Sequence, residues 1–345
     1  MNATERDINE QASGYSKLGW LVYWELLDLL PGHKPVNGQQ AKTDWDNGGM
    51  CEEFTPTPKD ADAAYSHAVR RGAVGIRDHG VRAKLLECPQ APEYKGARRI
   101  HAVVDLDAQH DATGKGYDIE ANARALIGYL MGDTDGNGDP MDDGSRIRTN
   151  DPLDEFGVPT DPIVCQVFSE YRDALKYVAP DAITRAIQQE LNLLSHVPMR
   201  THGGIYFVPE QDGALARLRE LQQVVEGWGS SRLHLLGVPD TVDERRAVQG
   251  AVGDSFHQEL TQTLAQVEQY QAKLAEWSGG DVEGDQAPVR QATLERRLTE
   301  LQELHQRAQL YAEVLEIKAD DLTTGIGDLE TMITTTLKDV FGVAA

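Results

Sequence analysis

Cysteine, basic residues and long apolar runs are all scarce in this chain of 345 residues, and each scarcity excludes a class of protein. The three cysteines, Cys51, Cys88 and Cys165, are odd in number and far apart, so they form neither a disulfide framework nor a Cys-x-x-Cys metal pair. No run approaches the roughly 18 apolar residues that a membrane-spanning helix needs. The polar start, Met-Asn-Ala-Thr-Glu-Arg-Asp, lacks the apolar core of a signal peptide. We therefore expect a cytoplasmic protein that has no membrane partner.

The shortage of basic residues gives the chain a net charge of −23, from 33 lysines and arginines against 56 acidic residues. Such a surface repels phosphate backbones, so we do not expect a general nucleic-acid binder, although a local basic groove stays open. A further hypothesis is an acidic decoy that mimics nucleic acid, which requires the charge to lie on one face. The hydrophobic fraction of 40% is enough for a core, and the length allows two domains.

Complete motifs of several enzyme classes are also missing from the sequence. Gly114-Lys115-Gly116 suggests a phosphate-binding loop, but Gln109 occupies the place of its leading glycine and Gly116 that of the Ser or Thr that meets Mg²⁺. There is no G-x-S-x-G elbow, no H-E-x-x-H pattern and no Rossmann glycine fingerprint after a strand. The sequence therefore predicts none of these activities.

The stretch that organises the chain is residues 199–209, Met-Arg-Thr-His-Gly-Gly-Ile-Tyr-Phe-Val-Pro. Its Gly-Gly pair permits a tight backbone turn, and the four residues that follow favour a strand. We expect helices at 181–195 and 213–228 on either side and a further strand at 232–238. This alternation predicts an α+β or α/β module with a mixed sheet and the stretch at its centre.

The preceding part of the chain gives less regular signals. We expect a strand that enters a short helix at 20–30, a loop at 32–60, and a helix at 60–71 that stops at Gly72. Antiparallel strands are expected at 81–88 and 99–107, a helix at 118–130, an acidic loop at 132–161 and a strand at 163–168.

The last third of the chain is helical in pattern. Apolar residues recur every three or four positions from Phe256 to Trp277 and again from Leu294 to Leu337, with an acidic, glycine-containing break at 278–288. We expect two long amphipathic helices that form a hairpin or coiled-coil arm. The predicted organisation is therefore an α/β module at 1–250 and a helical arm at 251–345.

The strongest chemical pattern is His101-Ala-Val-Val-Asp105-Leu-Asp107. On a strand, His101, Asp105 and Asp107 share one face, and two carboxylates at a strand end can hold Mg²⁺ or Mn²⁺ for phosphoryl or nucleotidyl transfer. The pattern is similar to the first metal motif of palm-type polymerases and archaeo-eukaryotic primases. In those primases a Ser-x-His motif follows, whereas here Ser195 directly precedes His196. A chance Asp-x-Asp at a strand end is the competing interpretation.

A second metal pattern is Asp133-Thr-Asp135-Gly-Asn137-Gly-Asp, which resembles the first half of an EF-hand loop. The resemblance implies oxygen ligands for Ca²⁺ from Asp133, Asp135 and Asn137. Gly144, however, stands where a bidentate Glu should close the site. An acidic solvated turn is the alternative interpretation.

Arg200 and His202 flank the Gly-Gly turn, and with Tyr206 they are candidates for contact with an anion or a protein partner. The stretch resembles a group of uncharacterised bacterial and phage proteins that share an R-x-x-G-G-(I/V)-Y-F-V-P core. That resemblance implies a prokaryotic or mobile-element setting and supplies no activity.

Two functional hypotheses follow from the sequence. The first is a non-enzymatic interaction or accessory protein of a phage or defence assembly, which self-associates or docks through its C-terminal helices. The second is a metal-dependent nucleotide or nucleic-acid enzyme that uses Asp105 and Asp107, with His101 beside them.

Overall fold

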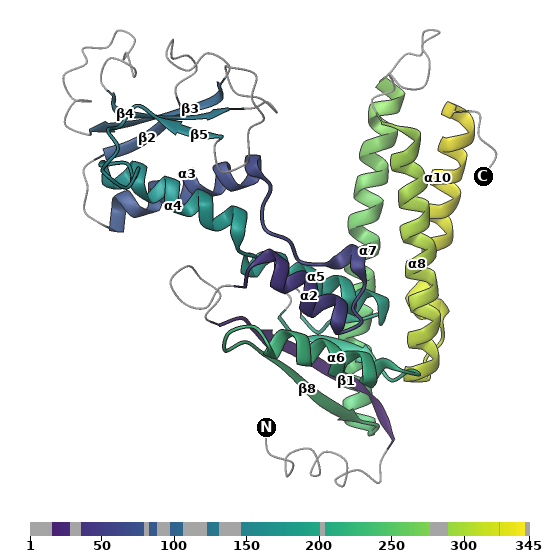
Figure 1. Cartoon of the computed structure of the whole chain (residues 1–345). Helices are drawn as coiled ribbons and strands as arrows, with labels where there is room; N and C mark the ends of the chain where they lie inside the picture. The colour runs from purple at the N-terminus through teal and green to yellow at the C-terminus, as the bar shows by residue number, and fades with distance from the viewer. Residues whose placement is uncertain are drawn as a thin grey trace, which may run out of the picture. The chain divides into compact units, whose positions relative to one another are not determined.

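A computed structural model describes residues 16–27, 36–78, 83–87, 97–105, 123–130, 146–200, 204–276, 289–323 and 325–341, without the side chains of residues 74–78, 97–98, 105 and 320–321 (Figure 1). The chain divides into two compact units. Unit 1 comprises Met1–Glu25, Gln188–Glu226 and Ser231–Ala345; unit 2 comprises Leu26–Ile187 and Gly227–Ser230. The boundary expected at residue 250 falls inside a single helix, α7 (Val242–Glu276).

Unit 2 is built on a four-stranded sheet in the order β2-β3-β4-β5. These strands are Ala83–Glu87, Ala97–Asp105, Ala123–Leu130 and Ile147–Thr149, and every pairing between them is antiparallel. Helices α3 (Ala61–Asp78) and α4 (Pro162–Lys176) lie together along one face of the sheet (Figure 1). The antiparallel strands expected at 81–88 and 99–107 are therefore confirmed over 83–87 and 99–105, the part of them that the structure describes.

Several expectations for unit 2 are wrong, and burial explains the largest one. The helix expected at 118–130 is wrong, because residues 123–130 are strand β4, whose residues 125–129 are all buried. Ala125 and Ile127 pack toward the helices, whereas Leu126 packs in a second cluster. A strand buried on both faces lacks the alternation of polar and apolar residues by which strands are recognised.

Helix starts account for two further corrections in unit 2. Residues 163–168 belong to α4, because Asp161 caps that helix and Pro162 opens it. The region expected as a loop at 32–60 contains α2 (Gly38–Asn47), which Asn37 caps, and the short 3₁₀ helix η1 (Glu52–Phe54). Gly72 lies inside α3 and does not end it.

Unit 1 is built on a second sheet, in the order β6-β7-β1-β8. The strands are Val197–Pro198, Tyr206–Pro209, Lys17–Glu25 and Arg232–Pro239. The strand expected at 205–208 is thus the interior strand β7. All described pairings in both sheets are antiparallel, so the fold is α+β, and the mixed sheet and the α/β alternative are wrong.

Two helices of unit 1 stay close to this sheet. The last turns of α5 (Pro180–Leu193), from Gln188 onward, belong to unit 1, and α6 (Ala214–Glu226) lies against the sheet (Figure 1). Arg217 of α6 joins them, because its Nε and Nη2 donate to Oε2 of the buried Glu190 at 3.2 and 2.8 Å.

The C-terminal part of unit 1 is a bundle of three long helices, α7, α8 (Gln291–Leu315) and α10 (Ile326–Phe341), with the short α9 (Asp320–Thr323) between the last two (Figure 1). The sequence predicted two long helices, but the second one ends at Glu316, which has a left-handed conformation. Cross-helix contacts of Gln249 with Leu315 and of Glu259 with Arg307 show that α7 and α8 are antiparallel. No helix in the described ranges combines the length and apolar character needed to cross a membrane.

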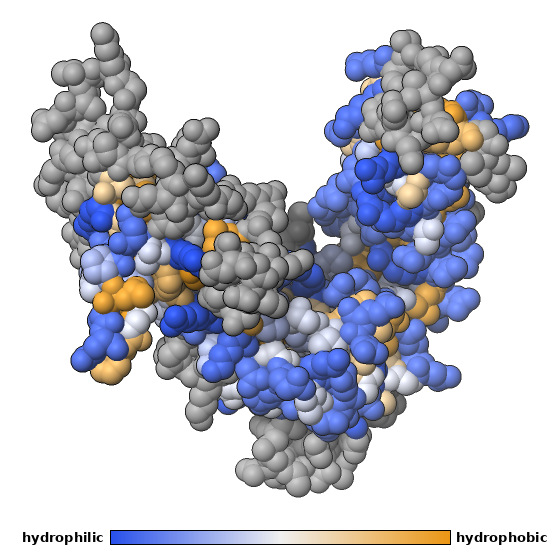
Figure 2. All heavy atoms as spheres, turned by 45° about the horizontal axis from the view of Figure 1, so that its top comes forward, coloured by the Kyte–Doolittle hydropathy of each residue, from blue (hydrophilic) through white to orange (hydrophobic). Residues whose placement is uncertain are grey.

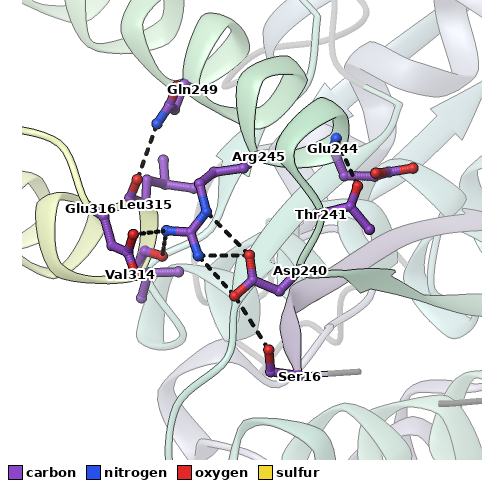
Figure 3. A network of polar contacts seen from close by, with 9 residues as sticks. All are labelled: Ser16, Asp240, Thr241, Glu244, Arg245, Gln249, Val314, Leu315 and Glu316. Atoms are coloured by element: carbon purple, nitrogen blue, oxygen red, sulfur yellow. Dashed lines mark hydrogen bonds and ion pairs between the residues drawn. The ribbon is translucent and has the colours of Figure 1, made fainter. Parts of the chain in front are cut away.

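Arg245 fixes the start of α7 to the end of α8 (Figure 3). Its Nε and Nη2 donate to Asp240, at distances down to 2.6 Å, while its Nη1 donates to the Val314 carbonyl and pairs with Glu316 at 3.3 Å. Asp240 also accepts from the Ser16 hydroxyl, just before β1. One guanidinium group therefore connects the sheet edge to two helices of the bundle.

Tyr311 of α8 joins the bundle to the sheet from inside the core. Its ring lies 6.2 Å from that of Phe207 in β7 and 6.0 Å from that of Phe256 in α7, measured between centroids. Its hydroxyl donates to the Ser195 carbonyl at 2.8 Å and to the Phe207 carbonyl at 3.3 Å. Burial raises the pKa of Tyr311 well above its usual range, so the phenol remains protonated and donates.

We predict that Tyr311→Phe lowers the free energy of unfolding by about 1–3 kcal/mol, because it removes the donor from buried carbonyls while keeping the ring. Urea unfolding followed by circular dichroism measures the change. Tyr23→Phe is the matched control: Tyr23 is half-buried on β1 and its ring stacks on His234, so we expect a loss below about 0.5 kcal/mol. Equal losses for both variants would contradict the role given to the Tyr311 hydroxyl.

Candidate functional site

A groove of about 670 Å³ lies between α7 and α8, beside the C-terminal end of α5, entirely within unit 1. Its lining is mostly polar. Helix α7 supplies residues 259, 262, 263 and 266, and α8 supplies residues between 297 and 307. Steps of three and four keep these positions on one side of each helix. The groove is therefore a continuous polar strip along two antiparallel helices.

The first guanidinium group in the groove belongs to Arg307. Its Nη2 donates to Oε2 of Glu259 across the groove at 2.5 Å. The guanidinium carbon lies 5.4 Å from the centre of the Phe256 ring, within the range of a cation–π contact. Only 24% of the Arg307 side chain is exposed. This group is therefore held in one place by both a carboxylate and an aromatic ring.

The second guanidinium group belongs to Arg297, whose side chain is 20% exposed. Its Nη1 donates to Glu300 at 2.5 Å. Burial opposes the charge of Arg297, but hydrogen bonds to Tyr270 and Glu300 outweigh that effect and raise its pKa. The two arginines are ten residues apart on α8, which corresponds to about 15 Å along a helix.

Three buried polar atoms of the groove make no hydrogen bond within the described part of the chain. They are Nε of Arg297, Nε of Arg307 and Oε1 of Gln266. A buried donor or acceptor without a partner costs about 1–3 kcal/mol. These atoms have almost no accessible surface, so a ligand that supplied acceptors to the arginines and a donor to Gln266 would recover part of that free energy only as the side chains turn toward it.

The chemistry of the lining indicates what such a ligand would be. The Nε and Nη2 edge of an arginine fits a carboxylate with two parallel hydrogen bonds. Gln262, Gln266 and Gln306 carry carboxamides, each of which has both a donor and an acceptor. Carboxamides pair with peptide groups by the same rule, so the groove suits a polypeptide segment that carries carboxylates.

The chain after α5 forms one rim of the groove. Ser195 lines it in a left-handed conformation, with φ 55, and its carbonyl is held by the Tyr311 hydroxyl. The next residue, His196, contacts the edge of the Tyr206 ring, at 5.0 Å between centroids. Burial lowers the pKa of His196 to about 4, with a further lowering by the positive charge of Arg307, so the imidazole is neutral near pH 7.

The residues of the predicted Asp-x-Asp metal site lie in unit 2 and are only partly described. His101 is half-buried on β3, and its Nδ1 lies 2.9 Å from the Tyr65 hydroxyl. Burial lowers its pKa. Asp105 is the last residue of β3, as expected for a strand-end carboxylate, whereas Asp107 lies outside the described residues. In the described ranges, no three His, Cys, Asp or Glu side chains come together as metal ligands.

Asp133, Asp135 and Asn137 of the EF-hand-like pattern, and His202 beside the Gly-Gly turn, also lie outside the described residues. Arg200 is exposed, and its guanidinium group lies over Gly204. Tyr206 is 6% exposed: its ring stacks on Trp24 and its hydroxyl accepts from Gln188. Little of Tyr206 is therefore left exposed for contact with a partner, and a joint site of Arg200, His202 and Tyr206 stays a prediction.

The groove arginines were not among the residues that the sequence singled out. A signal was present, because Arg297 and Arg307 stand at helical spacing with Leu301 and Leu304, which are buried in the bundle core. A charged residue next to the apolar stripe of a helix is partly buried, unlike a charged residue on the solvated face. The sequence could not predict which residues of α7 these arginines face, because that depends on how the two helical segments on either side of the break at 278–288 align.

Comparison with known proteins gives one match. The model of DUF6744, described as a family of unknown function, matches residues 133–340, which include every residue of the groove. No curated protein and no solved structure matches the chain. The match agrees with the expectation of an uncharacterised group, while the R-x-x-G-G-(I/V)-Y-F-V-P core stays a prediction.

We predict that His196 makes the stability of unit 1 depend on pH. The folded state lowers its pKa from 6.5 to about 4, so the unfolded chain binds the proton more tightly. Stability from this group is complete above pH 6.5 and is lost as the pH falls to 4, by on the order of 2–3 kcal/mol.

The measurement is urea unfolding at several pH values between 7 and 4. His196→Phe keeps an aromatic ring beside Tyr206 and removes the titration, so its free energy of unfolding should fall less over this window than that of the wild type. Parallel pH profiles for the two proteins would refute the assignment.

Proposed function

Because this chain belongs to DUF6744, a family of unknown function, we propose its role from its own residues: a non-enzymatic interaction protein that holds a segment of a protein partner in the groove between α7 and α8. The observation that carries this proposal is the pair of arginines with buried, unpartnered Nε atoms in a polar groove. The partner segment would place carboxylates against them and its peptide groups against the glutamines.

The use of the apolar residues in the bundle supports docking through polar groups. The apolar positions of α7, α8 and α10 form one core with residues of β1, β7 and β8, including Leu18, Phe207 and Val238. The face of the bundle visible at the right of Figure 2 is mostly hydrophilic. Because the apolar side chains of the helices are already buried against one another and against the sheet, a partner gains more binding free energy from the charged and amide groups of the groove than from an apolar stripe.

The test uses a photo-crosslinking residue, p-benzoylphenylalanine, placed at Gln306 in the full chain. Gln306 lines the groove, whereas Gln302, one turn earlier on α8, is exposed outside it and serves as the matched control. Crosslinking is carried out in cells that naturally make the chain, and adducts are identified by mass spectrometry. We expect a discrete protein adduct from position 306 and not from position 302.

The arginines provide the second part of this test. Arg297→Gln combined with Arg307→Gln should reduce the adduct from position 306 about tenfold or more, because it removes two charge-assisted contacts. Arg296→Gln is the control, since Arg296 lies on the same helix, is 65% exposed and forms a long ion pair with Glu300 at 3.6 Å. Identical adducts from both crosslinking positions, or an adduct insensitive to the double substitution, would show that the groove is not the docking site.

A second candidate function is the metal-dependent nucleotide or nucleic-acid enzyme. It is favoured by the position of Asp105 at the end of β3. A ligand that binds the folded state raises its melting temperature. If the enzyme hypothesis holds, Mn²⁺ or Mg²⁺ raises the melting temperature of the wild type and not that of Asp105→Asn/Asp107→Asn. We expect no such difference, and observing it would move the assignment to the enzyme. A Ca²⁺ shift that survives this double substitution would point to Asp133, Asp135 and Asn137.

A further inference from the structure

A short loop in unit 2 presents an exposed aromatic side chain. It covers residues 150–161, between β5 and α4, and Phe156 at its centre is 80% exposed. Leu153, in the same loop, is 57% exposed. Single exposed apolar residues are common on protein surfaces, so exposure alone indicates little. What distinguishes Phe156 is how firmly its loop is held.

The backbone around Phe156 is fixed by the side chain of Asp154. Its Oδ1 accepts from the N–H of Phe156 at 2.9 Å and from that of Val158 at 2.8 Å. The Asp154 N–H in turn donates to the Val158 carbonyl at 2.8 Å. Gly157 closes the turn with φ +72, a conformation that other residues rarely adopt. The loop is therefore closed on itself at the point where Phe156 projects.

Both ends of the loop are tied to regular structure. At the start, Asn150 Oδ1 accepts from the Leu126 N–H of β4 at 2.7 Å. At the end, Asp151 accepts from the Asp161 N–H at 2.7 Å, and Asp161 caps α4 and pairs with Arg124 at 2.6 Å. The loop is thus continuous with the sheet and with α4, and the backbone at Phe156 has little conformational freedom to lose on binding.

Such an arrangement has the properties of a binding anchor. Burial of a phenylalanine side chain in a partner's pocket removes a large apolar area from water, and an ordered backbone loses little of that gain to conformational entropy. Aromatic side chains that fill a partner's pocket carry a large share of the energy at protein interfaces. Phe156 offers that contribution from a backbone that is already in place.

The charge around the anchor indicates the partner. Residues 150–161 contain four acidic residues and no lysine or arginine. Of these, Asp154 and Glu155 are exposed next to Phe156, whereas Asp151 is buried and Asp161 is paired with Arg124. A second copy of this acidic chain would bring like charges together. A basic surface would instead be attracted to this rim.

We propose that residues 150–161 form a second docking surface, in which Phe156 enters an apolar pocket of a partner protein and the pocket is bordered by lysine or arginine. Leu153 extends the apolar contact, and Asp154 and Glu155 face the basic border. This surface lies in unit 2 and is independent of the groove in unit 1. Its success or failure is therefore separate from that of the proposed function.

The first step of the test places p-benzoylphenylalanine at position 156 of the full chain, in cells that naturally make it. This replaces one aromatic side chain by another at an exposed position. The control carries the same group at Val242, which is 73% exposed at the start of α7 in unit 1. We expect a discrete protein adduct from position 156 that position 242 does not give. An absent adduct, or one with twice the mass of the chain, would overturn the proposal.

The second step measures the Kd between the captured protein and the purified chain. Phe156→Ser should weaken binding about tenfold or more, whereas Val242→Ser should leave the Kd unchanged. Gly157→Ala, which strains the turn without touching Phe156, should weaken binding several-fold. Binding should also weaken with rising salt, and less steeply for Glu155→Gln.

Melting temperatures of these variants provide the folding control. Because Phe156 is largely exposed, Phe156→Ser should melt within a few degrees of the wild type. A Kd that is insensitive to both Phe156→Ser and salt would refute the surface, even if a protein had been captured. A loss of binding in Phe156→Ser with unchanged binding in Gly157→Ala would refute the role of the ordered loop.

Discussion

The Tyr311 hydroxyl is the interaction on which the arrangement of unit 1 depends. A phenol buried among Phe207 and Phe256 needs a hydrogen-bond acceptor, and it takes the Ser195 carbonyl. Because the same hydroxyl also lies 3.3 Å from the Phe207 carbonyl, it ties the rim of the groove that follows α5 to β7. Phe256, against which the Tyr311 ring packs, also carries the guanidinium group of Arg307. The aromatic residues that join the helices to the sheet therefore also position Ser195 and Arg307 of the polar groove.

Much of the fold could be predicted from local patterns. The strands at 81–88 and 99–107, the helices flanking the organising strand, and the long helical runs after Phe256 all follow from periodicity and turn residues. The errors have a common cause. Strand β4 is buried on both faces, and α4 begins with an apolar run after its Asp161-Pro162 cap, so burial concealed the period in one case and mimicked a strand in the other.

The candidate site was less accessible to sequence than the fold. The sequence singled out His101 and Asp105 because their spacing lies within one strand, and their role stays a prediction. The groove instead needs Glu259 from one helix, Arg307 from another and Ser195 from a turn, and no local pattern joins them. Similarly, the loop that carries Phe156 is held by hydrogen bonds to the Asp154 side chain, in a segment that composition describes only as an acidic loop.

The place of β1 in the sheet of unit 1 has a consequence for synthesis on the ribosome. Val22 pairs with Tyr206 on one side and Leu235 on the other, so the chain makes residues 26–187 of unit 2 before either partner strand exists. During that interval the apolar run from Trp20 to Trp24 has no sheet to join, which is when unpaired strands aggregate. Unit 2 can fold first as the nascent chain lengthens. A slow translation rate before β7 would then expose this segment for longer, and a chaperone that covers it would raise the yield of folded protein.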